Sequence, residues 1–144
     1  MDTTPVTLLL VEDDDVDAEA IQRAFRQQRI ANPFVVVRDG VEALEALRQP
    51  GAVPRPFLVL LDINMPRMSG IEFLEALRDD PQLRQAIVFV LTTSDRDEDK
   101  LAAYSQHVAG YIVKSRAGED FLAVVQLLKA YWRIVEFPPE VALA

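Results

Sequence analysis

Acidic side chains directly follow two of the short apolar runs in this sequence. Glu12 and Asp13 come after one run, and Asp62 comes after another. If the two runs form neighbouring strands, these carboxylates meet at one edge of a sheet, where each raises the pKa of the others unless a cation lies between them. Carboxylate and carbonyl oxygens are the ligands that Mg²⁺ prefers. The sequence therefore predicts a Mg²⁺ site, with the backbone carbonyl of Asn64 as a further ligand.

A hydroxyl and a lysine follow two further apolar runs. Thr92 comes directly after one of them and Lys114 directly after the other. With the carboxylates and a metal ion, these groups complete a site for a tetrahedral anion, at which catalysis consists of positioning and charge neutralisation. We expect Asp62 to be the nucleophile that accepts a phosphoryl group. Thr92 Oγ and Lys114 Nζ are each expected to contact a phosphoryl oxygen.

Five apolar runs must position these groups, and each is followed by a polar loop and a segment with helical spacing. Continuous apolar character is typical of strands buried on both faces of a parallel sheet. We expect an α/β fold, a (βα)₅ doubly wound five-stranded parallel sheet in the flavodoxin-like order 2-1-3-4-5, with its working site at the carboxyl ends of the strands. The predicted strands are Thr7–Val11, Phe34–Val37, Phe57–Leu61, Ile87–Leu91 and Tyr111–Val113.

Between these strands the apolar spacing changes to the period of a helix. Asp39 and Glu42 resemble a capping box that begins the second helix. The spacing predicts a long last helix from about Gly118 to Glu136, extended by a tail. It also predicts a weaker fourth helix from about Glu98 to Ser105. We therefore expect an N-terminal tail over 1–6, one domain over 7–130, and an extension of the last helix with a C-terminal tail over 131–144.

Length and composition exclude several classes of protein. A chain of 144 residues with 50% hydrophobic residues has room for one ordinary domain. Its net charge of −8 argues against DNA as a partner, and the absence of cysteine excludes disulfides and thiolate metal sites. Apolar runs of five or six residues are too short to cross a membrane, and the sequence carries no export signal at its start. We expect a cytoplasmic protein that contacts neither DNA nor membrane.

Four segments in order resemble the response-regulator receiver domain of two-component signalling, a CheY-like domain. They are Leu9–Asp14 (LLVEDD), Leu61–Gly70 (LDINMPRMSG), Val90–Ser94 (VLTTS) and Gly110–Lys114 (GYIVK). The resemblance implies that Asp62 accepts its phosphoryl group from a sensor histidine kinase. It also implies that Thr92 shifts toward the phosphate, that Tyr111 reorients as the readout, and that Asn64 and Ser94 tune the lifetime of the phosphorylated state. Such a domain catalyses its own phosphorylation and slow dephosphorylation but is a signalling protein.

Two residues depart from the commonest family pattern. Ser115 follows Lys114 where the family usually has a proline after a cis peptide bond. Since a cis bond before a residue other than proline costs about 2.5–4 kcal/mol, either this bond is trans or the loop holds it under strain. Glu12 replaces aspartate, a milder change of one methylene.

Three segments of the chain resemble those of the small regulators that are paired with bacterial phytochromes and related sensor kinases. The Leu91–Ser94 element, a longer loop over Arg48–Phe57 and the tail Tyr131–Pro139 carry this resemblance. It implies a bacteriophytochrome as the kinase and a homodimer that the tail helps to build. The apolar excess at the end of the last helix supports the same expectation. The predicted dimer contacts are Tyr131, Trp132, Val135 and Phe137, and the alternative is a tail that folds back on its own domain.

Plainer interpretations exist for single residues of the proposed site. The acidic run around Asp13 also suits a solvated helix start, although an EF-hand is excluded because its sixth and twelfth positions are Ala18 and Ala24. Lys114 also suits an ordinary surface position, and Tyr111 suits the core. For Thr93 and Ser94 a turn ahead of a helix is the favoured interpretation, and the single His107 is taken as a surface residue.

Two other functions remain open at this point. One is a pseudo-receiver that binds partners without phosphorylation, which the departure at Ser115 keeps open. The other is a Mg²⁺-dependent phosphatase with an aspartyl intermediate. Such an enzyme needs a second carboxylate two positions after its nucleophile, where this chain has Asn64.

Overall fold

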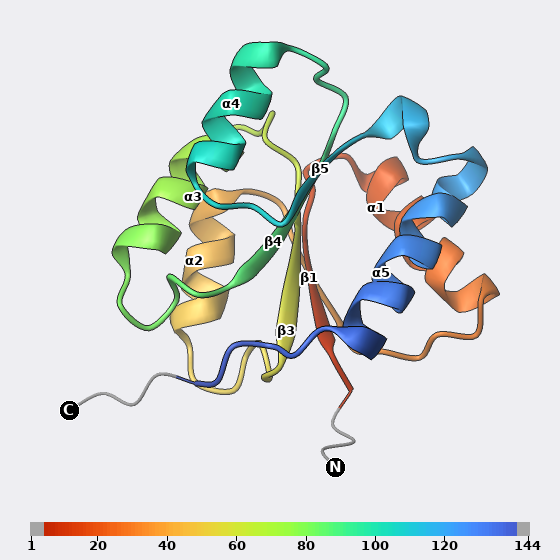
Figure 1. Cartoon of the computed structure of the whole chain (residues 1–144), viewed down its shortest axis with the longest axis horizontal. Helices are drawn as coiled ribbons and strands as arrows, with labels where there is room; N and C mark the ends of the chain where they lie inside the picture. Colours follow the sequence, from red (N-terminus) through yellow and green to blue (C-terminus); the bar gives the residue numbers. More distant parts are fainter. Residues whose placement is uncertain (1–4, 141–144) are drawn as a thin grey trace.

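Five parallel strands form a single sheet in the order β2-β1-β3-β4-β5, which confirms the predicted topology. The structure is a computed structural model that describes residues 5–140. Helices cover both faces of the sheet, with α1 and α5 on one side and α2, α3 and α4 on the other (Figure 1). The elements are β1 (Thr7–Val11), α1 (Asp15–Gln27), β2 (Phe34–Val37), α2 (Gly40–Arg48), β3 (Phe57–Leu61), α3 (Gly70–Asp79), β4 (Ile87–Thr92), α4 (Asp97–Ser105), β5 (Gly110–Val113), η1 (Lys114–Arg116), η2 (Glu119–Phe121) and α5 (Leu122–Ile134).

The three central strands are apolar because both of their faces are covered. Every residue of β1 and of β3 is buried. Alternate side chains along each strand point to opposite faces, so they divide between two hydrophobic clusters, one under each layer of helices. The pairing of Val11 with Leu61 places the residues after β1 beside those after β3. The sheet therefore brings Glu12, Asp13 and Asp62 to one edge.

Side-chain caps begin three of the helices at this edge, α1, α2 and α3. Asp14 accepts hydrogen bonds from the backbone N–H groups of Val16 and Asp17 at the start of α1. Ser69 and Glu72 form a reciprocal capping box at α3. At α2, Asp39 accepts a hydrogen bond of 2.9 Å from the N–H of Glu42, and its other carboxylate oxygen binds Arg67. Of the capping box predicted for α2, the structure shows the hydrogen bond that Asp39 accepts.

The last helix is shorter than the spacing predicted. It runs over Leu122–Ile134, and the preceding residues form two short 3₁₀ turns. Asp120 and Phe121 both have positive φ, so the chain breaks the helical path just before α5. Val135 is the C-cap and has extended backbone. The predicted boundaries at Gly118 and Glu136 were therefore too wide, because periodicity alone did not register this turn.

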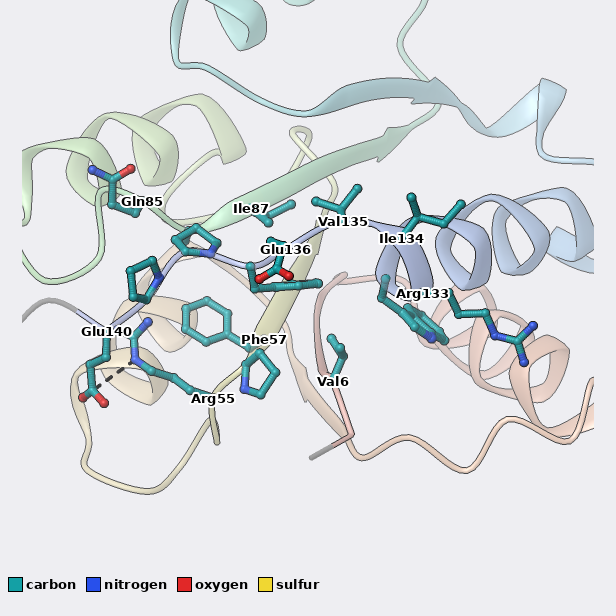
Figure 2. A pocket seen from close by; sticks show the side chains of 16 residues that line it. Val6, Arg55, Phe57, Gln85, Ile87, Arg133, Ile134, Val135, Glu136 and Glu140 are labelled. Atoms are coloured by element: carbon teal, nitrogen blue, oxygen red, sulfur yellow. Dashed lines mark ion pairs between the residues drawn. The ribbon is translucent and has the colours of Figure 1, made fainter. Parts of the chain in front are cut away.

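The segment after α5 folds back across the amino ends of β1, β3 and β4. It lines a cleft of about 680 Å³ together with Val6, Phe57 and Ile87 (Figure 2). At the far side of this cleft, Glu140 lies 3.9 Å from the guanidinium of Arg55. The cleft lies at the end of the sheet opposite the acidic edge. Residues 1–4 and 141–144 of the predicted tails lie outside the described residues.

Candidate functional site

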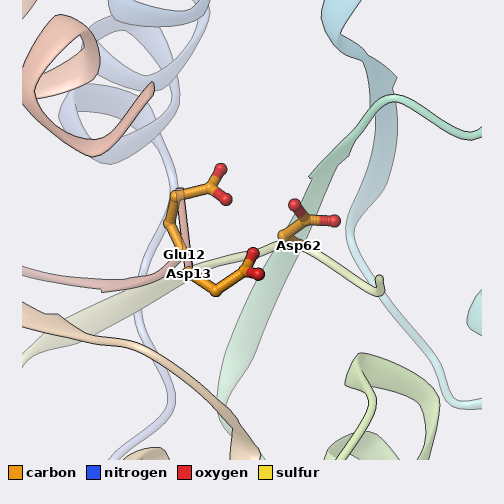
Figure 3. A group of neighbouring side chains, drawn as sticks. All are labelled: Glu12, Asp13 and Asp62. Carbon is orange, nitrogen blue, oxygen red and sulfur yellow. The ribbon is translucent and has the colours of Figure 1, made fainter. Parts of the chain in front are cut away.

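Three carboxylates converge at the carboxyl ends of β1 and β3. One oxygen each from Glu12, Asp13 and Asp62 lies within 4.8 Å of the others (Figure 3). Glu12 and Asp62 are buried and Asp13 is half-buried. Because like charges at this separation repel, the donor set fits a divalent cation bound by oxygen ligands. The structure thus brings together the three side-chain ligands that the sequence predicted, while the carbonyl of Asn64 stays a prediction.

Asp62 is held by donors from the end of β4, from the turn after β5 and from its own loop. Thr92 Oγ donates to Oδ1 of Asp62 at 2.8 Å, and the backbone N–H of Asn64 donates to the same oxygen at 3.0 Å. Oδ2 lies 3.4 Å from Nζ of Lys114. The side chain of Asp62 is 8% exposed. This buried carboxylate is therefore fixed in orientation, and the predicted hydroxyl and lysine both reach it.

The Lys114 ammonium is shared among three carboxylates. Nζ lies 2.6 Å from Oε1 of Glu12, 2.8 Å from Oδ2 of Asp17 and 3.4 Å from Oδ2 of Asp62. Burial lowers the pKa of Lys114, but the hydrogen bonds to Asp17 and Glu12 outweigh burial and leave the pKa above its usual value. A surface lysine is therefore wrong as an interpretation of Lys114. The sequence did not identify Asp17 as a partner, because an acidic residue in the first turn of a helix has an ordinary local explanation.

The peptide bond after Lys114 is trans. Within residues 5–140 the one cis bond joins Arg55 to Pro56, so Lys114–Ser115 takes the first of the two possibilities that the sequence left open. Lys114, Ser115 and Arg116 form a 3₁₀ turn directly after β5. This turn places the lysine at the same edge of the sheet as the carboxylates.

Burial also shifts the titration of Glu12. Desolvation raises the pKa of this carboxyl to about 7, and the hydrogen bond from Lys114 opposes the shift. A cation bound by Glu12, Asp13 and Asp62 would favour the ionised form of Glu12. Proton and metal binding are therefore coupled at this side chain.

The loop between β3 and α3 is tied to the start of α2. Arg67 donates to Oδ2 of Asp39 at 2.7 Å, and the N–H of Gly40 donates to the carbonyl of Met68 at 3.4 Å. Gly70 lies so close to this loop that a Cβ there would meet the Cα of Ile63 at 2.5 Å. These contacts fix the segment that follows Asp62.

Tyr111 and Ser94 join β5 to the loop after β4. The hydroxyl of Tyr111 donates to the backbone carbonyl of Ser94 at 2.9 Å, and the Ser94 hydroxyl is hydrogen-bonded to Asp99 in α4. Tyr111 is half-buried, and the apolar part of its side chain packs against the core under α2, α3 and α4. Ser94 follows Thr92 by two residues, and Tyr111 pairs with Val90 in the register of β4 and β5. Their predicted parts in switching and in lifetime stay predictions.

The four predicted dimer contacts divide into two groups. Tyr131 packs edge-to-face on Phe89, Trp132 stacks on Phe25, and Phe137 packs on Tyr131, so these rings largely cover their own domain. Val135 is 37% exposed, beside Ile134 at 82%. The alternative of a tail folded back on its own domain is therefore what the described residues show.

No helix among residues 5–140 has the length and apolar character needed to cross a membrane.

The sequence profile of the response regulator receiver domain matches residues 8–126, and this span holds all the groups described above except the tail. The chain belongs to this family. Receiver domains are generally parts of signalling proteins, and this chain is a response regulator of that kind.

The chain is similar to several response regulators, two of which are named as response regulators of phytochromes or bacteriophytochromes. Response regulator Rcp1 of Synechocystis sp. (strain ATCC 27184 / PCC 6803 / Kazusa) is 37% identical over 131 residues, which are 89% of each chain. The crystal structure of its Mn²⁺-bound form matches with a TM-score of 0.81 over 94% of this chain and 100% of that one. The phosphorylated cyanobacterial phytochrome response regulator RcpA is 35% identical, with a TM-score of 0.83 and coverage of 94% and 99%. The bacteriophytochrome response regulator AtBRR is 33% identical, with a TM-score of 0.70 and coverage of 91% and 97%.

Proposed function

We propose that Asp62 accepts a phosphoryl group from a sensor histidine kinase and that the phosphorylated chain signals through contacts with other proteins. The observation that carries this proposal is the convergence of Thr92, Lys114 and the acidic cluster on one buried carboxylate. A carboxylate oxygen attacks phosphorus, and the donor's bond to phosphorus breaks as its leaving group departs. The family and the phosphorylated structure of the similar RcpA support this assignment.

The site residues have different roles in phosphoryl transfer according to their charge. Lys114 supplies a positive charge and Thr92 a neutral donor to oxygens of the transferred group. Glu12, Asp13, Asp62 and the carbonyl of Asn64 would hold Mg²⁺, which neutralises the charge on that group when it is bound. The Mn²⁺-bound form of Rcp1 supports a divalent cation in this family. Autophosphorylation from small donors and slow autodephosphorylation follow from the same groups, with Asn64 and Ser94 setting the lifetime.

We propose that Thr92 and Tyr111 carry the change at Asp62 to the surface. Thr92 contacts Asp62 directly, and Tyr111 contacts the loop that follows Thr92. A shift of the Thr92 hydroxyl toward a phosphoryl oxygen would therefore alter the Ser94 carbonyl that Tyr111 binds. The surface affected is formed by β5 and the neighbouring α4.

We propose a bacteriophytochrome as the kinase, in the cytoplasm, because the relatives named above include response regulators of phytochromes and bacteriophytochromes. The decisive experiment is phosphotransfer from a phosphorylated bacteriophytochrome kinase to the wild-type chain and to Asp62→Asn. Transfer of label to the wild type alone supports the proposal. Transfer from other histidine kinases but not from this class would support Asp62 as the acceptor and exclude a bacteriophytochrome as the kinase.

A homodimer through α5 is the second part of the proposal. Spacing of i, i+4, i+7 and i+11 puts four residues on one helix face, and all four are exposed: Ala123, Leu127, Ala130 and Ile134. Of the contacts predicted from the sequence, Val135 is exposed directly after the end of α5, while Tyr131, Trp132 and Phe137 pack against the core of their own domain.

Sedimentation of the wild type and of Leu127→Glu tests the dimer. The substitution places a charge at the centre of the apolar face, so we expect it to produce monomers. Leu122→Glu is the matched control, because Leu122 is 40% exposed on a different face of α5. A monomeric wild type, or equal effects of both substitutions, would contradict this interface.

The alternative function is an adaptor of receiver fold that binds partners without phosphorylation. The departure at Ser115 keeps this alternative open, and the contact of Lys114 with Asp62 across a trans bond before Ser115 argues against it. An adaptor would bind its partner equally well as the wild type and as Asp62→Asn. Phosphoryl transfer that changes partner affinity would exclude it.

A further inference from the structure

Asp17 of α1 is a third partner of Lys114 and lies outside the acidic cluster that would bind the metal ion. Its Oδ2 lies 2.8 Å from Nζ, whereas Oδ2 of Asp62 lies at 3.4 Å. The Lys114 side chain is 9% exposed and that of Asp17 is 30% exposed. Nζ of Lys114 therefore lies closer to Asp17, and to Glu12 at 2.6 Å, than to the acceptor carboxylate.

Helix capping does not account for this position of Asp17. The third helical position of a capping box normally reaches back to the N–H of the N-cap residue. Here the N–H of Asp14 is directed at Oε2 of Glu12, at 3.3 Å, and the Asp17 carboxylate is on Lys114 instead. The orphan N–H groups of Val16 and Asp17 are already bound by the Asp14 side chain. The Asp17 carboxylate is thus committed to the lysine.

We propose that Asp17 is a positioning residue that holds Lys114 in the unphosphorylated site and competes with the phosphoryl group for it. The inference rests on the proposed function of Asp62. When a bond forms between a carboxylate oxygen of Asp62 and phosphorus, and acetate leaves an acetyl phosphate donor, the new phosphoryl oxygens attract the ammonium. The Lys114 ammonium then either leaves Asp17 or contacts both Asp17 and the phosphoryl oxygens. An ion pair made mainly in the unphosphorylated state opposes phosphorylation.

Asp17→Asn removes the competing charge with little change in shape. We expect the rate of phosphorylation by acetyl phosphate, at saturating Mg²⁺, to rise by about threefold, the effect of a partly exposed ion pair. Glu19→Gln is the matched control, because it removes one negative charge from the same helix, where Glu19 pairs with Arg23 and Arg26. We expect no change in that variant. Equal rates in Asp17→Asn and Glu19→Gln, or a slower rate in Asp17→Asn, would overturn the competition.

The same substitutions in a Lys114→Met background separate this mechanism from a general effect on α1. If Asp17 acts through Lys114, Asp17→Asn changes nothing once the lysine is gone. The same acceleration in both backgrounds would overturn the inference. A wild-type chain that takes no phosphoryl group at all would instead contradict the proposed function, and with it the competition.

A double-mutant cycle on stability needs neither Mg²⁺ nor a phosphoryl donor. The urea midpoints of the wild type, Asp17→Asn, Lys114→Met and the double variant measure the resting pair alone. We expect Asp17→Asn to lower the midpoint in the wild-type background and to lower it less, or to raise it, without Lys114. Additive midpoints would overturn the claim that Asp17 holds the lysine, whatever the rates of phosphorylation.

Discussion

Thr92 Oγ donates a hydrogen bond of 2.8 Å to Oδ1 of Asp62, and this bond joins the ends of β4 and β3 at the base of the acidic cluster. Thr92 is fully buried and Asp62 nearly so. The bond is therefore made away from water, where an unpaired carboxylate oxygen is costly. It orients Asp62 before any donor arrives.

Replacing Thr92 by valine should destabilise the fold while leaving its shape intact. The isosteric side chain removes the buried hydroxyl donor, so we expect the free energy of unfolding in urea to fall by about 1–2 kcal/mol. Thr92→Ser should recover most of this loss. Thr93→Val is the control, because Thr93 is exposed, and an equal effect at both positions would contradict the role given to the Thr92 bond.

Mg²⁺ affinity should depend on pH through Glu12. Burial raises the pKa of Glu12 to about 7 without metal, so a proton must leave before the ion binds at lower pH. We expect the affinity measured by titration calorimetry to rise up to about tenfold per pH unit below pH 7 and to level off above it. Glu12→Gln should bind more weakly, with little pH dependence in this range. A steep dependence that persists in Glu12→Gln would show that another group titrates.

The same shift predicts how stability changes with pH when Mg²⁺ is absent. The folded chain binds the Glu12 proton more tightly than the unfolded chain, where the pKa is near 4.5. The contribution of Glu12 to stability is therefore full below about pH 4.5 and is lost as the pH rises to about 7. Urea unfolding across this window should show a weaker decline for Glu12→Gln than for the wild type. A decline of equal size in both proteins would contradict the assignment.

Asp39 links helix capping to the loop after Asp62. Burial raises its pKa, but hydrogen bonds from Arg67 and from the N–H of Glu42 outweigh burial and hold the pKa below its usual value of 3.8. Asp39→Ala loses the cap and should cost about 1 kcal/mol of unfolding free energy. Asp39→Asn keeps an acceptor for Glu42 and should cost less.

The ionised form of Asp39 stabilises the fold above its unfolded pKa, and this contribution disappears as the pH falls through the lower folded pKa. The difference in stability between the wild type and Asp39→Asn should therefore close below about pH 4. A difference that persists at low pH would mean that the Arg67 pair is not its source. Urea unfolding at several pH values measures this.

Much of the fold could be predicted because buried strands and helices leave periodic patterns. The first three strands were predicted with their observed boundaries, and right-handed crossovers together with a doubly wound, flavodoxin-like closure predicted the observed order of the sheet. The position of Asp62, Thr92 and Lys114 follows from the rule that sites lie at the carboxyl ends of strands. The predicted order of the strands and the rule for strand ends together predicted which main groups meet.

The remaining features depend on contacts that leave no local pattern. The pair of Asp17 and Lys114 joins two ends of the chain, and an acidic residue near a helix start has an ordinary local explanation. Helical spacing likewise does not fix the direction of Trp132. It predicts an apolar position there, but not the stacking of Trp132 on Phe25. The turn with positive φ at Asp120 and Phe121 lacks the glycine that usually signals such a conformation.

Gly70 should be intolerant of a side chain. A Cβ there would meet the Cα of Ile63 and the carbonyl oxygen of Asp62, at 2.5 and 2.7 Å, so the loop itself would have to move. We expect Gly70→Ala to unfold at a lower urea concentration and to be phosphorylated more slowly than the wild type. Gly110→Ala is a milder comparison, because its Cβ would meet only the Phe89 ring at 3.1 Å. Wild-type rates in Gly70→Ala would contradict the idea that this close packing positions Asp62.

The most direct test of the account is the intact mass of the protein after incubation with acetyl phosphate and Mg²⁺, beside Asp62→Asn under the same conditions. Asp62→Asn keeps the size of the side chain and removes the nucleophilic carboxylate. We expect a gain of one phosphoryl group in the wild type and none in the variant. A wild type that gains no mass from acetyl phosphate or from an active histidine kinase, while folded and saturated with Mg²⁺, would contradict it.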